Sequence, residues 1–324
     1  MSPARPIHPT TRAERADGDA AAVLAIAEAA TSADGVAPFN EDSLLSLDER
    51  SLVLVSLSDP NADADPDDDE DAAAGDPAGA ALARPVDGGA GLEAELAVHP
   101  GHRLNGAGRA LVDALLAQAR EAGASRLTLW AHGALPGAIA LAASAGLERV
   151  RTLLRLELAL GPDAAPAPAE PVAPPAGILV ADFDPAADAA EFLRLNARVF
   201  RHHPEQGALD ERGLRARMEQ PWFRADRFVV ARDADSGAML GYNWLKSEQE
   251  TGEIYVVGVA DEAAGRGIGR ALMVEGLRRL RQDRPERIEL YVEGDNDRAV
   301  GLYRSLGFVD AAVDVQFARD VDAV

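Results

Sequence analysis

The C-terminal half of the chain alternates runs of β-branched residues with segments that carry apolar side chains at helical spacing. Between Ala186 and Phe200 the apolar positions recur every three or four residues, which predicts an amphipathic helix. Further elements are expected after it in this order: strands at 227–232, 238–246 and 253–259, a helix at about 268–281, a strand at 287–292, a helix at about 296–306 and a strand at 309–317. A run of strands followed by alternating helices and strands predicts a mixed α/β (α+β) domain.

The same pattern is present twice. Gly106–Leu111 aligns without gaps with Gly267–Leu272, and at the same offset of 161 residues Gly146 aligns with Gly307. Further matches at that offset place Val98 on Val259 and Leu129-Trp130 on Leu290-Tyr291. Matches that stay in register over this distance indicate two copies of one fold.

Two biased segments divide the chain further. Residues 161–176 form a Pro-rich segment with six prolines, which predicts an extended linker between a first domain at 1–160 and a second at 177–324. Within the first domain, 59–76 holds nine acids and no base, so we expect a disordered insertion at about 58–80. A calcium loop is disfavoured there, because the Gly and the closing Glu of an EF-hand are missing.

Composition excludes several classes of protein. The 324 residues carry a formal charge of −22, which argues against binding to nucleic acid or anionic lipid. There is no Cys, so thiolate metal sites and cysteine nucleophiles are excluded, and the six His show no metal-ligand spacing. With no signal peptide and no membrane span in the sequence, we expect a soluble, cytoplasmic, monomeric protein that needs no metal.

The informative chemistry lies in a strand, a turn and a helix start. The strand ends at Val257-Gly258-Val259, and Arg266–Arg270 then opens a helix with two glycines and two arginines. Glycines let the backbone approach an anion, which the free N–H groups of a helix N-terminus bind. A Walker loop is excluded because no Lys-Ser/Thr follows the last Gly, and the connector is too long for a Rossmann turn.

These residues resemble the GNAT (Gcn5-related) N-acetyltransferase family. The resemblance rests on Arg266–Arg270 after a strand, followed by Glu293–Ala299 and Leu302–Phe308. The family has Gln or Arg where this copy has Ala264, whereas the first copy has Arg103 there. The resemblance implies two tandem domains, each a mostly antiparallel mixed sheet flanked by helices, and acetyl-CoA as co-substrate.

In this family the strand backbone at 257–259 pairs with the pantetheine of acetyl-CoA, and Tyr303 matches the Tyr that protonates the departing thiolate. The resemblance implies that the second copy contacts the coenzyme through Val257, Gly258, Val259, Ala264, Gly265, Arg266, Gly267, Ile268, Gly269, Arg270, Asn296, Asp297 and Arg298. In the first copy the corresponding residues are Leu96, Ala97, Val98, Arg103, Leu104, Asn105, Gly106, Ala107 and Gly108.

Further local strings resemble one tandem member of the family. They include Asp34–Pro38, Trp130–Gly133, His203–Gly207 and Glu253–Val259. This resemblance implies a small-molecule acceptor, the cysteinyl amine of a cysteine–glucosaminyl–inositol conjugate. It also implies that the acceptor is contacted by Glu41, Glu205, Lys246, Glu253 and Tyr291.

The residue types fit that chemistry. An α-amine has a pKa of about 7.7–8.0 and must lose a proton before it attacks a thioester. Glu253 begins the strand that would hold the pantetheine, so its carboxylate is placed to act as the base. Several acids around one pocket also suit a cationic amine and a polyol, and their repulsion raises the pKa of one of them.

The two copies differ at the positions that matter for catalysis. At the offset of 161, Tyr303 falls on Ala142 and Glu253 on Leu92. We therefore expect the first copy to bind acetyl-CoA without catalysing transfer, or to serve only as a structural partner. The alternatives for the whole chain are a tandem GNAT enzyme for another amine, such as an aminoglycoside, a polyamine or a protein N-terminus, and a non-catalytic acetyl-CoA-binding regulator.

Overall fold

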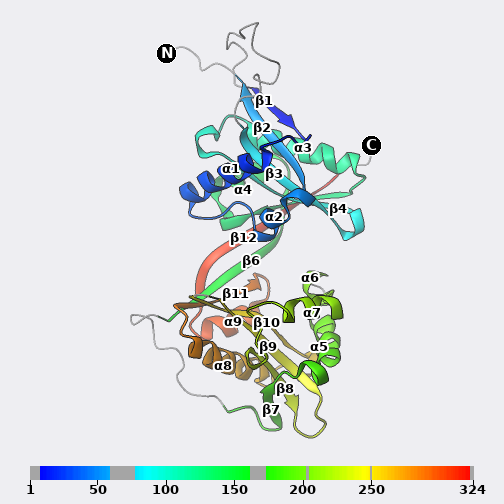
Figure 1. Ribbon diagram of the computed structural model, residues 1–324, viewed down its shortest axis with the longest axis vertical. Helices are drawn as coiled ribbons and strands as arrows, with labels where there is room; N and C mark the ends of the chain where they lie inside the picture. Colours follow the sequence, from blue (N-terminus) through cyan, green and yellow to red (C-terminus); the bar gives the residue numbers. More distant parts are fainter. Residues whose placement is uncertain (1–7, 59–76, 161–172, 202–203, 249, 322–324) are drawn as a thin grey trace. The chain divides into compact units, whose positions relative to one another are not determined.

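The computed structural model describes residues 8–58, 77–160, 173–201, 204–248 and 250–321 (Figure 1). The chain divides into two compact units, one formed by Met1–Leu153 with Val313–Val324 and the other by Leu154–Ala312. The acidic run at 59–76, with its candidate calcium ligands, and most of the Pro-rich linker, at 161–172, lie outside the described residues. No helix among the described residues is long and apolar enough to cross a membrane.

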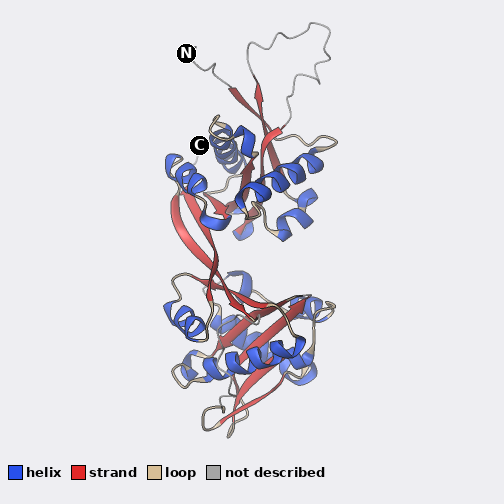
Figure 2. Ribbon diagram, turned by 90° about the vertical axis from the view of Figure 1, so that its left-hand side faces the viewer, coloured by secondary structure: helices blue, strands red, loops and turns tan. Residues whose placement is uncertain are grey.

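The first unit is a mixed sheet with helices on both faces (Figures 1 and 2). Its strand order is β1-β2-β3-β4-β5-β12, and only β4 and β5 run parallel. Its helix α1 packs on β3 and β4, and α3 packs against β2, β3 and β4. The elements are β1 (His8–Arg12), α1 (Asp19–Asp34), α2 (Glu41–Leu45), β2 (Ser51–Ser58), β3 (Pro77–Val86), β4 (Gly91–Val98), α3 (Ala107–Glu121), β5 (Arg126–Ala131), α4 (Pro136–Ser144) and β12 (Val309–Asp320).

The second unit repeats this plan. Its strand order is β6-β11-β10-β9-β8-β7, with β10 and β11 parallel. Phe192 and Leu195 of α5 pack on the aromatic side chains of β8 and β9, while α8 and α9 share a core with β6, β10 and β11. The elements are β6 (Glu148–Ala159), β7 (Ile178–Asp182), α5 (Pro185–Val199), α6 (Pro204–Gly207), α7 (Glu211–Met218), β8 (Phe228–Asp233), β9 (Met239–Glu248), β10 (Thr251–Val259), α8 (Ile268–Leu280), β11 (Arg287–Glu293) and α9 (Asp297–Ser305).

The element bounds follow the sequence repeat. Helix α3 begins at Ala107 and α8 at Ile268, which is the offset of 161 residues. The same offset relates β5 to β11 at their first residues, α4 to α9 at both ends, and β6 to β12 at both ends. The gapless alignment therefore corresponds to structure from the Gly-rich turn to the end of each copy, whereas the first residues of β4 and β10 correspond at an offset of 160, because β10 contains one extra residue.

The unit boundaries differ from the expected domains in one respect. The second half of β12 pairs with β5, from Val315 opposite Ala131 to Asp320 opposite Arg126, so the end of the chain belongs to the first unit. In the same way, β6 begins in the first unit and continues into the second from Leu154 onward. The expected second domain at 177–324 is corrected accordingly, because hydrogen bonding between strands, and not chain order, decides which sheet a strand joins.

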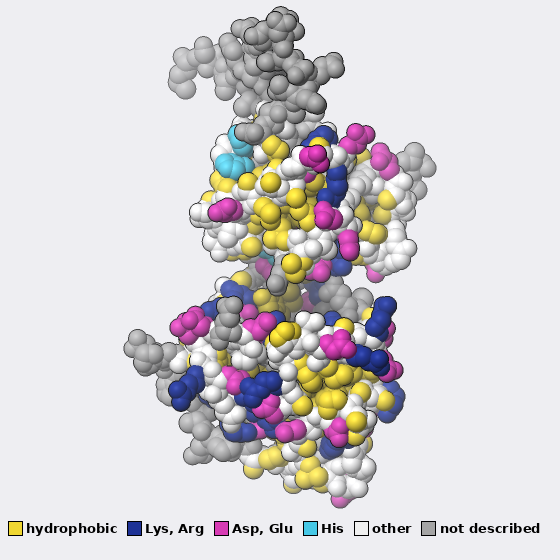
Figure 3. Space-filling view, in the orientation of Figure 1, with side chains coloured by type: hydrophobic (Ala, Val, Ile, Leu, Met, Phe, Trp, Pro, Cys, Tyr) yellow, Lys and Arg dark blue, Asp and Glu magenta, His cyan; other side chains and the backbone are white. Residues whose placement is uncertain are grey.

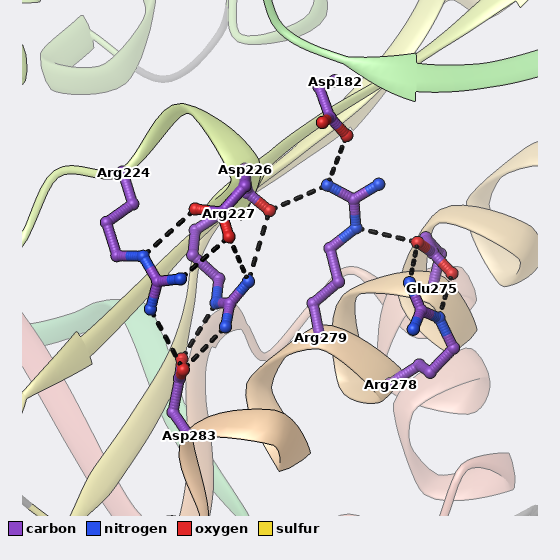
Figure 4. A network of polar contacts seen from close by, with 8 residues as sticks. All are labelled: Asp182, Arg224, Asp226, Arg227, Glu275, Arg278, Arg279 and Asp283. Atoms are coloured by element: carbon purple, nitrogen blue, oxygen red, sulfur yellow. Dashed lines mark hydrogen bonds and ion pairs between the residues drawn. The ribbon is translucent and has the colours of Figure 1, made fainter.

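Ion pairs occupy many of the arginines of the second unit. Arg227 is only 3% exposed and donates to Asp283 at 2.6 and 2.9 Å, and Asp226 binds it as well (Figure 4). Arg279 of α8 reaches Asp182 of β7 at 2.6 Å. These contacts lower the pKa of Asp283 through its hydrogen bond with Arg227. On the face shown in Figure 3, basic and acidic side chains of this unit are accordingly intermixed.

Candidate active site

The parallel strands β10 and β11 diverge early. They pair only from Thr251 opposite Arg287 to Glu253 opposite Glu289, although β10 continues to Val259. Across this gap the backbone of β10 at 257–259 has no partner on β11 among the described residues. A strand edge of this kind exposes N–H and C=O groups that an extended, amide-bearing ligand can pair with.

A β-bulge lies beside the point of divergence. The register between β9 and β10 shifts between Ile254 and Val256, which leaves Tyr255 as the extra residue. Its hydroxyl accepts a hydrogen bond of 2.8 Å from Arg217 of α7, and its ring packs on Trp222 and Trp244. Bulges redirect a strand and are frequent beside active sites.

A Gly-rich turn follows β10. Gly265 and Gly267 adopt φ of 82° and 81°, conformations that favour glycine, and α8 begins at Ile268. The first N–H groups of α8 therefore have no partner within the helix. Arg266 is about half exposed beside this turn, and Arg270 donates to Ser305 of α9 at 2.8 Å. The turn combines free amides, a helix N-terminus and cationic side chains, the features that bind a pyrophosphate.

The first unit has the same turn with different side chains. Leu104 has a φ of 64° and is fully exposed, Gly106 has a φ of 86°, and α3 begins at Ala107. Arg103 is held by two hydrogen bonds to Asp34, at 2.8 and 2.6 Å. The backbone of the predicted anion site is thus present twice, but the cation of the first copy is already paired.

Glu253 is the best candidate base. Its carboxylate makes no hydrogen bond or ion pair with any described residue. Burial raises the pKa of Glu253 to about 7; Lys246 acts against this rise, and Glu289 and Glu248 add to it. A carboxyl group with a pKa near the working pH accepts a proton efficiently and releases it again.

Tyr303 is the best candidate acid. It lies on α9 and is 6% exposed, and the centre of its ring lies 6.2 Å from the centre of the Phe308 ring. Burial raises the pKa of Tyr303 to about 12, so the phenol stays protonated at neutral pH. Its hydroxyl makes no hydrogen bond within the described part of the chain, which leaves the proton available to a leaving group.

The family model described as "Acetyltransferase (GNAT) family" matches residues 48–147 and 191–308, most of both units. The chain belongs to the GNAT acetyltransferase family. This confirms the mixed α/β fold that the order of elements predicted and the acetyltransferase class that the family resemblance implied. GNAT acetyltransferases use acetyl-CoA, so the diverging strands and the turn before α8 fit the coenzyme that this family uses.

Curated relatives extend over nearly the whole chain. The mycothiol acetyltransferase of Clavibacter michiganensis subsp. michiganensis is 43% identical over 300 residues, covering 92% of this chain and 90% of the relative. That of Kineococcus radiotolerans is 44% identical over 301 residues, covering 92% of each.

Solved structures share the tandem fold. A GCN5-related N-acetyltransferase from Sphaerobacter thermophilus has a TM-score of 0.74 and 22% identity, covering 98% of this chain and 97% of that one. A tandem GNAT protein from the clavulanic acid pathway has a TM-score of 0.66 and 20% identity, covering 98% and 99%. The fold of the whole chain, with both copies, is therefore that of tandem GNAT proteins.

The other predicted coenzyme residues of this GNAT chain lie at the start of α9. The Asn296 side chain caps that helix by accepting from the Ala299 N–H at 3.1 Å. Asp297 and Arg298 follow in the first turn and are exposed. The side-chain oxygen of Asn296 therefore already has a structural partner within α9.

The predicted acceptor residues are distributed over both units. Lys246 of β9 pairs with Glu248 at 2.6 Å, and Tyr291 of β11 is about half exposed. Glu41 begins α2 of the first unit, and Glu205 lies in α6 of the second. The side chains of Glu41 and Glu205, and His203 as a whole, lie outside the described part of the structure.

A buried ionic cluster lies in the first unit, at residues to which no charge network was assigned from the sequence. His132, which follows β5, donates from Nε2 to Glu95 at 2.7 Å and from Nδ1 to Asp314 of β12 at 3.2 Å. Burial alone would lower the pKa of His132, but Asp314 and Glu95 outweigh it and raise it to about 9. Only the assembly of β4, β5 and β12 brings the three side chains together, so no local motif could have predicted them.

Proposed function

We propose that this chain transfers the acetyl group of acetyl-CoA to the cysteinyl amine of Cys-GlcN-Ins, the cysteine–glucosaminyl–inositol conjugate, and so produces mycothiol. The observation that carries the proposal is the identity of 40–44% to mycothiol acetyltransferases over more than nine-tenths of the chain. The pair of Glu253 and Tyr303 in the second unit supports the chemistry, since one is a base near neutral pH and the other a protonated acid.

The proposed reaction assigns one proton transfer to each residue. Glu253 takes a proton from the cysteinyl ammonium, directly or through water, and the neutral amine then attacks the thioester carbonyl carbon. A C–N bond forms and, as the tetrahedral intermediate collapses, the C–S bond breaks. The nitrogen releases its second surplus proton to water, and Tyr303 donates its phenolic proton to the sulfur, so that coenzyme A leaves as a thiol. Tyr303 then regains a proton from solvent and Glu253 releases the one that it took.

The coenzyme contacts of the second unit follow from the strand edge and the turn. The edge at Val257, Gly258 and Val259 would pair with the pantetheine amides, as the unpaired side of β10 suggests. The pyrophosphate would lie at the turn formed by Ala264, Gly265, Arg266, Gly267, Ile268, Gly269 and Arg270. A helix N-terminus contributes about 0.3–1 kcal/mol per anion through its dipole, and the direct N–H hydrogen bonds add to this.

The first unit would bind acetyl-CoA without using it. Its turn has the same backbone, but Ala142 stands where the second unit has Tyr303. The strand registers place Glu93 at the position of Glu253, and Arg84 binds that carboxylate at 2.7 Å. Its strands β4 and β5 also stay paired as far as Glu95 opposite Trp130, two residues beyond the divergence in the second unit, without a bulge. The longer pairing of β4 with β5, the paired Glu93 and the missing Tyr all favour a non-catalytic copy.

The proposal also covers the location, the oligomeric state and the metal requirement of the enzyme. The enzyme would act as a cytoplasmic monomer on two small molecules, without a metal ion. Among the described residues no group of His, Asp and Glu could hold one. With no Cys in the chain, the enzyme has no thiol that could exchange with its thiol product.

The experiment is a comparison of acceptors. Values of kcat/KM with acetyl-CoA are measured for Cys-GlcN-Ins and for an aminoglycoside, a polyamine and a peptide N-terminus. The proposal expects Cys-GlcN-Ins to exceed each of them by at least about 100-fold, the discrimination that a site with dedicated polar contacts gives. Faster turnover of another amine would overturn the acceptor, and no turnover of any amine would favour a coenzyme-binding regulator.

A further inference from the structure

Four charged side chains lie in a row across the sheet of the second unit. Glu253 of β10 is the strand partner of Lys246 on β9 and of Glu289 on β11. Glu289 in turn forms an ion pair of 2.9 Å with Arg155 of β6. The row therefore crosses β9, β10, β11 and β6 in that order, with a positive charge on each outer strand and a negative charge on each of the two inner strands. Side chains on directly paired residues stand about 4.5–5.5 Å apart at Cβ, close enough for their charges to interact.

Each cation in this row is bound by an acid other than Glu253. Arg155 binds Glu289, and both side chains are largely buried, at 31% and 16% exposure. Lys246 binds Glu248, two residues along its own strand, at 2.6 Å, and its ammonium also lies 5.5 Å from the centre of the Trp222 ring. Glu253 makes no hydrogen bond or ion pair with any described residue.

We propose that Glu289, held by Arg155, and Glu248, which holds Lys246, are positioning residues that keep Glu253 without a counter-ion and thereby set its basicity. The inference rests on the proposed function, because it concerns the base of that reaction. It assigns roles to three residues outside the predicted site, Arg155, Glu248 and Glu289. It also gives Lys246 a second role beside acceptor binding.

The charged groups around Glu253 point the same way. Besides the row itself, the neighbouring strands carry Arg287 of β11, which lies 4.0 Å from Glu157 of β6. In the helix layer, Arg217 of α7 binds the hydroxyl of Tyr255, two residues from Glu253, through its Nε. Each of these cations has an acceptor of its own. After burial, the pKa of Glu253 is therefore set by Lys246, which lowers it, and by the negative charges of Glu289 and Glu248, which raise it.

The first unit lacks this arrangement. The strand registers place Glu93 at the position of Glu253, since its strand partners are Arg84 on β3 and Thr128 on β5. Arg84 binds Glu93 directly at 2.7 Å. The first unit thus pairs this acid with the cation on the neighbouring strand, whereas in the described part of the second unit no ion pair joins Glu253 to Lys246.

The sign of each substitution follows from charge. Glu289→Gln removes a like charge beside Glu253, so the pKa of Glu253, raised to about 7 in the wild type, falls. Glu248→Gln removes a second like charge, together with the ion pair that it forms with Lys246, and the pKa of Glu253 falls again. We expect a decrease of roughly one unit in each variant, the usual size of a neighbouring-charge effect. Glu286 is an exposed acid of the same unit, and Glu286→Gln is the control variant, in which we expect the pKa of Glu253 to stay unchanged.

The test measures the titration of Glu253 itself. Full-length protein carrying carboxyl-¹³C glutamate is titrated by NMR, with Glu253→Gln used to assign the resonance and circular dichroism used to confirm folding. If Glu289→Gln fails to fold because Arg155 loses its partner, the double variant Arg155→Gln/Glu289→Gln replaces it, with the same expected decrease. An unchanged Glu253 titration in the Glu289 and Glu248 variants overturns the proposal.

A second readout separates this inference from the proposed function. The acidic limb of kcat/KM for acetyl transfer should move to lower pH by the same amount as the NMR titration. If the NMR titration moves and the kinetic limb does not, the row sets the pKa of Glu253 as inferred, and its role as the base is wrong. If neither moves, the row does not control Glu253.

Discussion

Replacing Glu253 by Gln tests the predicted base most sharply. The amide has nearly the same shape but cannot accept a proton, so it removes proton transfer with little change in packing. General base catalysis contributes about 10²–10⁴-fold, and we expect kcat to fall within that range. KM for acetyl-CoA should stay close to the wild-type value, because the proposed coenzyme contacts lie at the strand edge and the turn beyond Glu253.

The pH dependence gives the same prediction a second measure. In the wild type, kcat/KM should rise as the pH passes through about 7, where Glu253 loses its proton. The cysteinyl amine titrates higher, at about 7.7–8.0, and contributes a separate limb. In the Gln variant the limb near 7 should vanish and only the amine limb should remain.

The assay follows the loss of the thioester absorbance of acetyl-CoA, because the acceptor and the product both carry a cysteinyl thiol that a thiol reagent would also titrate. The matched control is Glu286→Gln. A Glu253→Gln enzyme within about tenfold of wild type, with the limb near pH 7 intact, would refute the assignment of the base, since general base catalysis is worth more than that.

Four further outcomes are expected. Tyr303→Phe should lower kcat by at least about tenfold with little change in Tm, because only the proton donor is lost. Gly267→Ala should raise KM for acetyl-CoA, since its φ of 81° disfavours a side chain, whereas the matching Gly106→Ala in the first unit should leave turnover unchanged. Because the pKa of Glu253 is raised on folding, its charged form opposes folding. Glu253→Gln should therefore increase the free energy of unfolding at pH 8 by at most about 3 kcal/mol, and Tm with it, and should leave both unchanged at pH 4. Protonated His132 stabilises the fold fully below about pH 6.5, and this contribution is lost as the pH rises through about 9. The free energy of unfolding in urea should therefore decline over that window, and the decline should be absent from His132→Gln.

Local patterns predicted much of this fold. The helix α5 was expected from Ala186 to Phe200 and runs from Pro185 to Val199, because a Pro and an Asp cap begin it and its apolar face is regular. The repeat located the second copy of every element from the Gly-rich turn onward. Glycine turns and helical periodicity are encoded over a few neighbouring residues, so they can be read without knowledge of the tertiary fold.

Strand partners could not be predicted in this way. Nothing near Val313 indicates that the last strand pairs with β5 of the first unit. The repeat also misleads at the candidate base: Leu92 pairs with Leu127, which would place Ile288 opposite Glu253, yet Glu289 lies there. The register of β10 changes at its bulge, and a shift of one residue turns an apolar neighbour into a charged one.

The most direct test of the central claim is where the acetyl group goes. The enzyme is incubated with Cys-GlcN-Ins and ¹³C-acetyl-CoA, and the product is fragmented by mass spectrometry. We predict one labelled acetyl group on the cysteinyl nitrogen with a free thiol, and at most a trace of that product with the double variant Glu253→Gln/Tyr303→Phe. Label on the sulfur, on the sugar or on no acceptor at all would contradict the account.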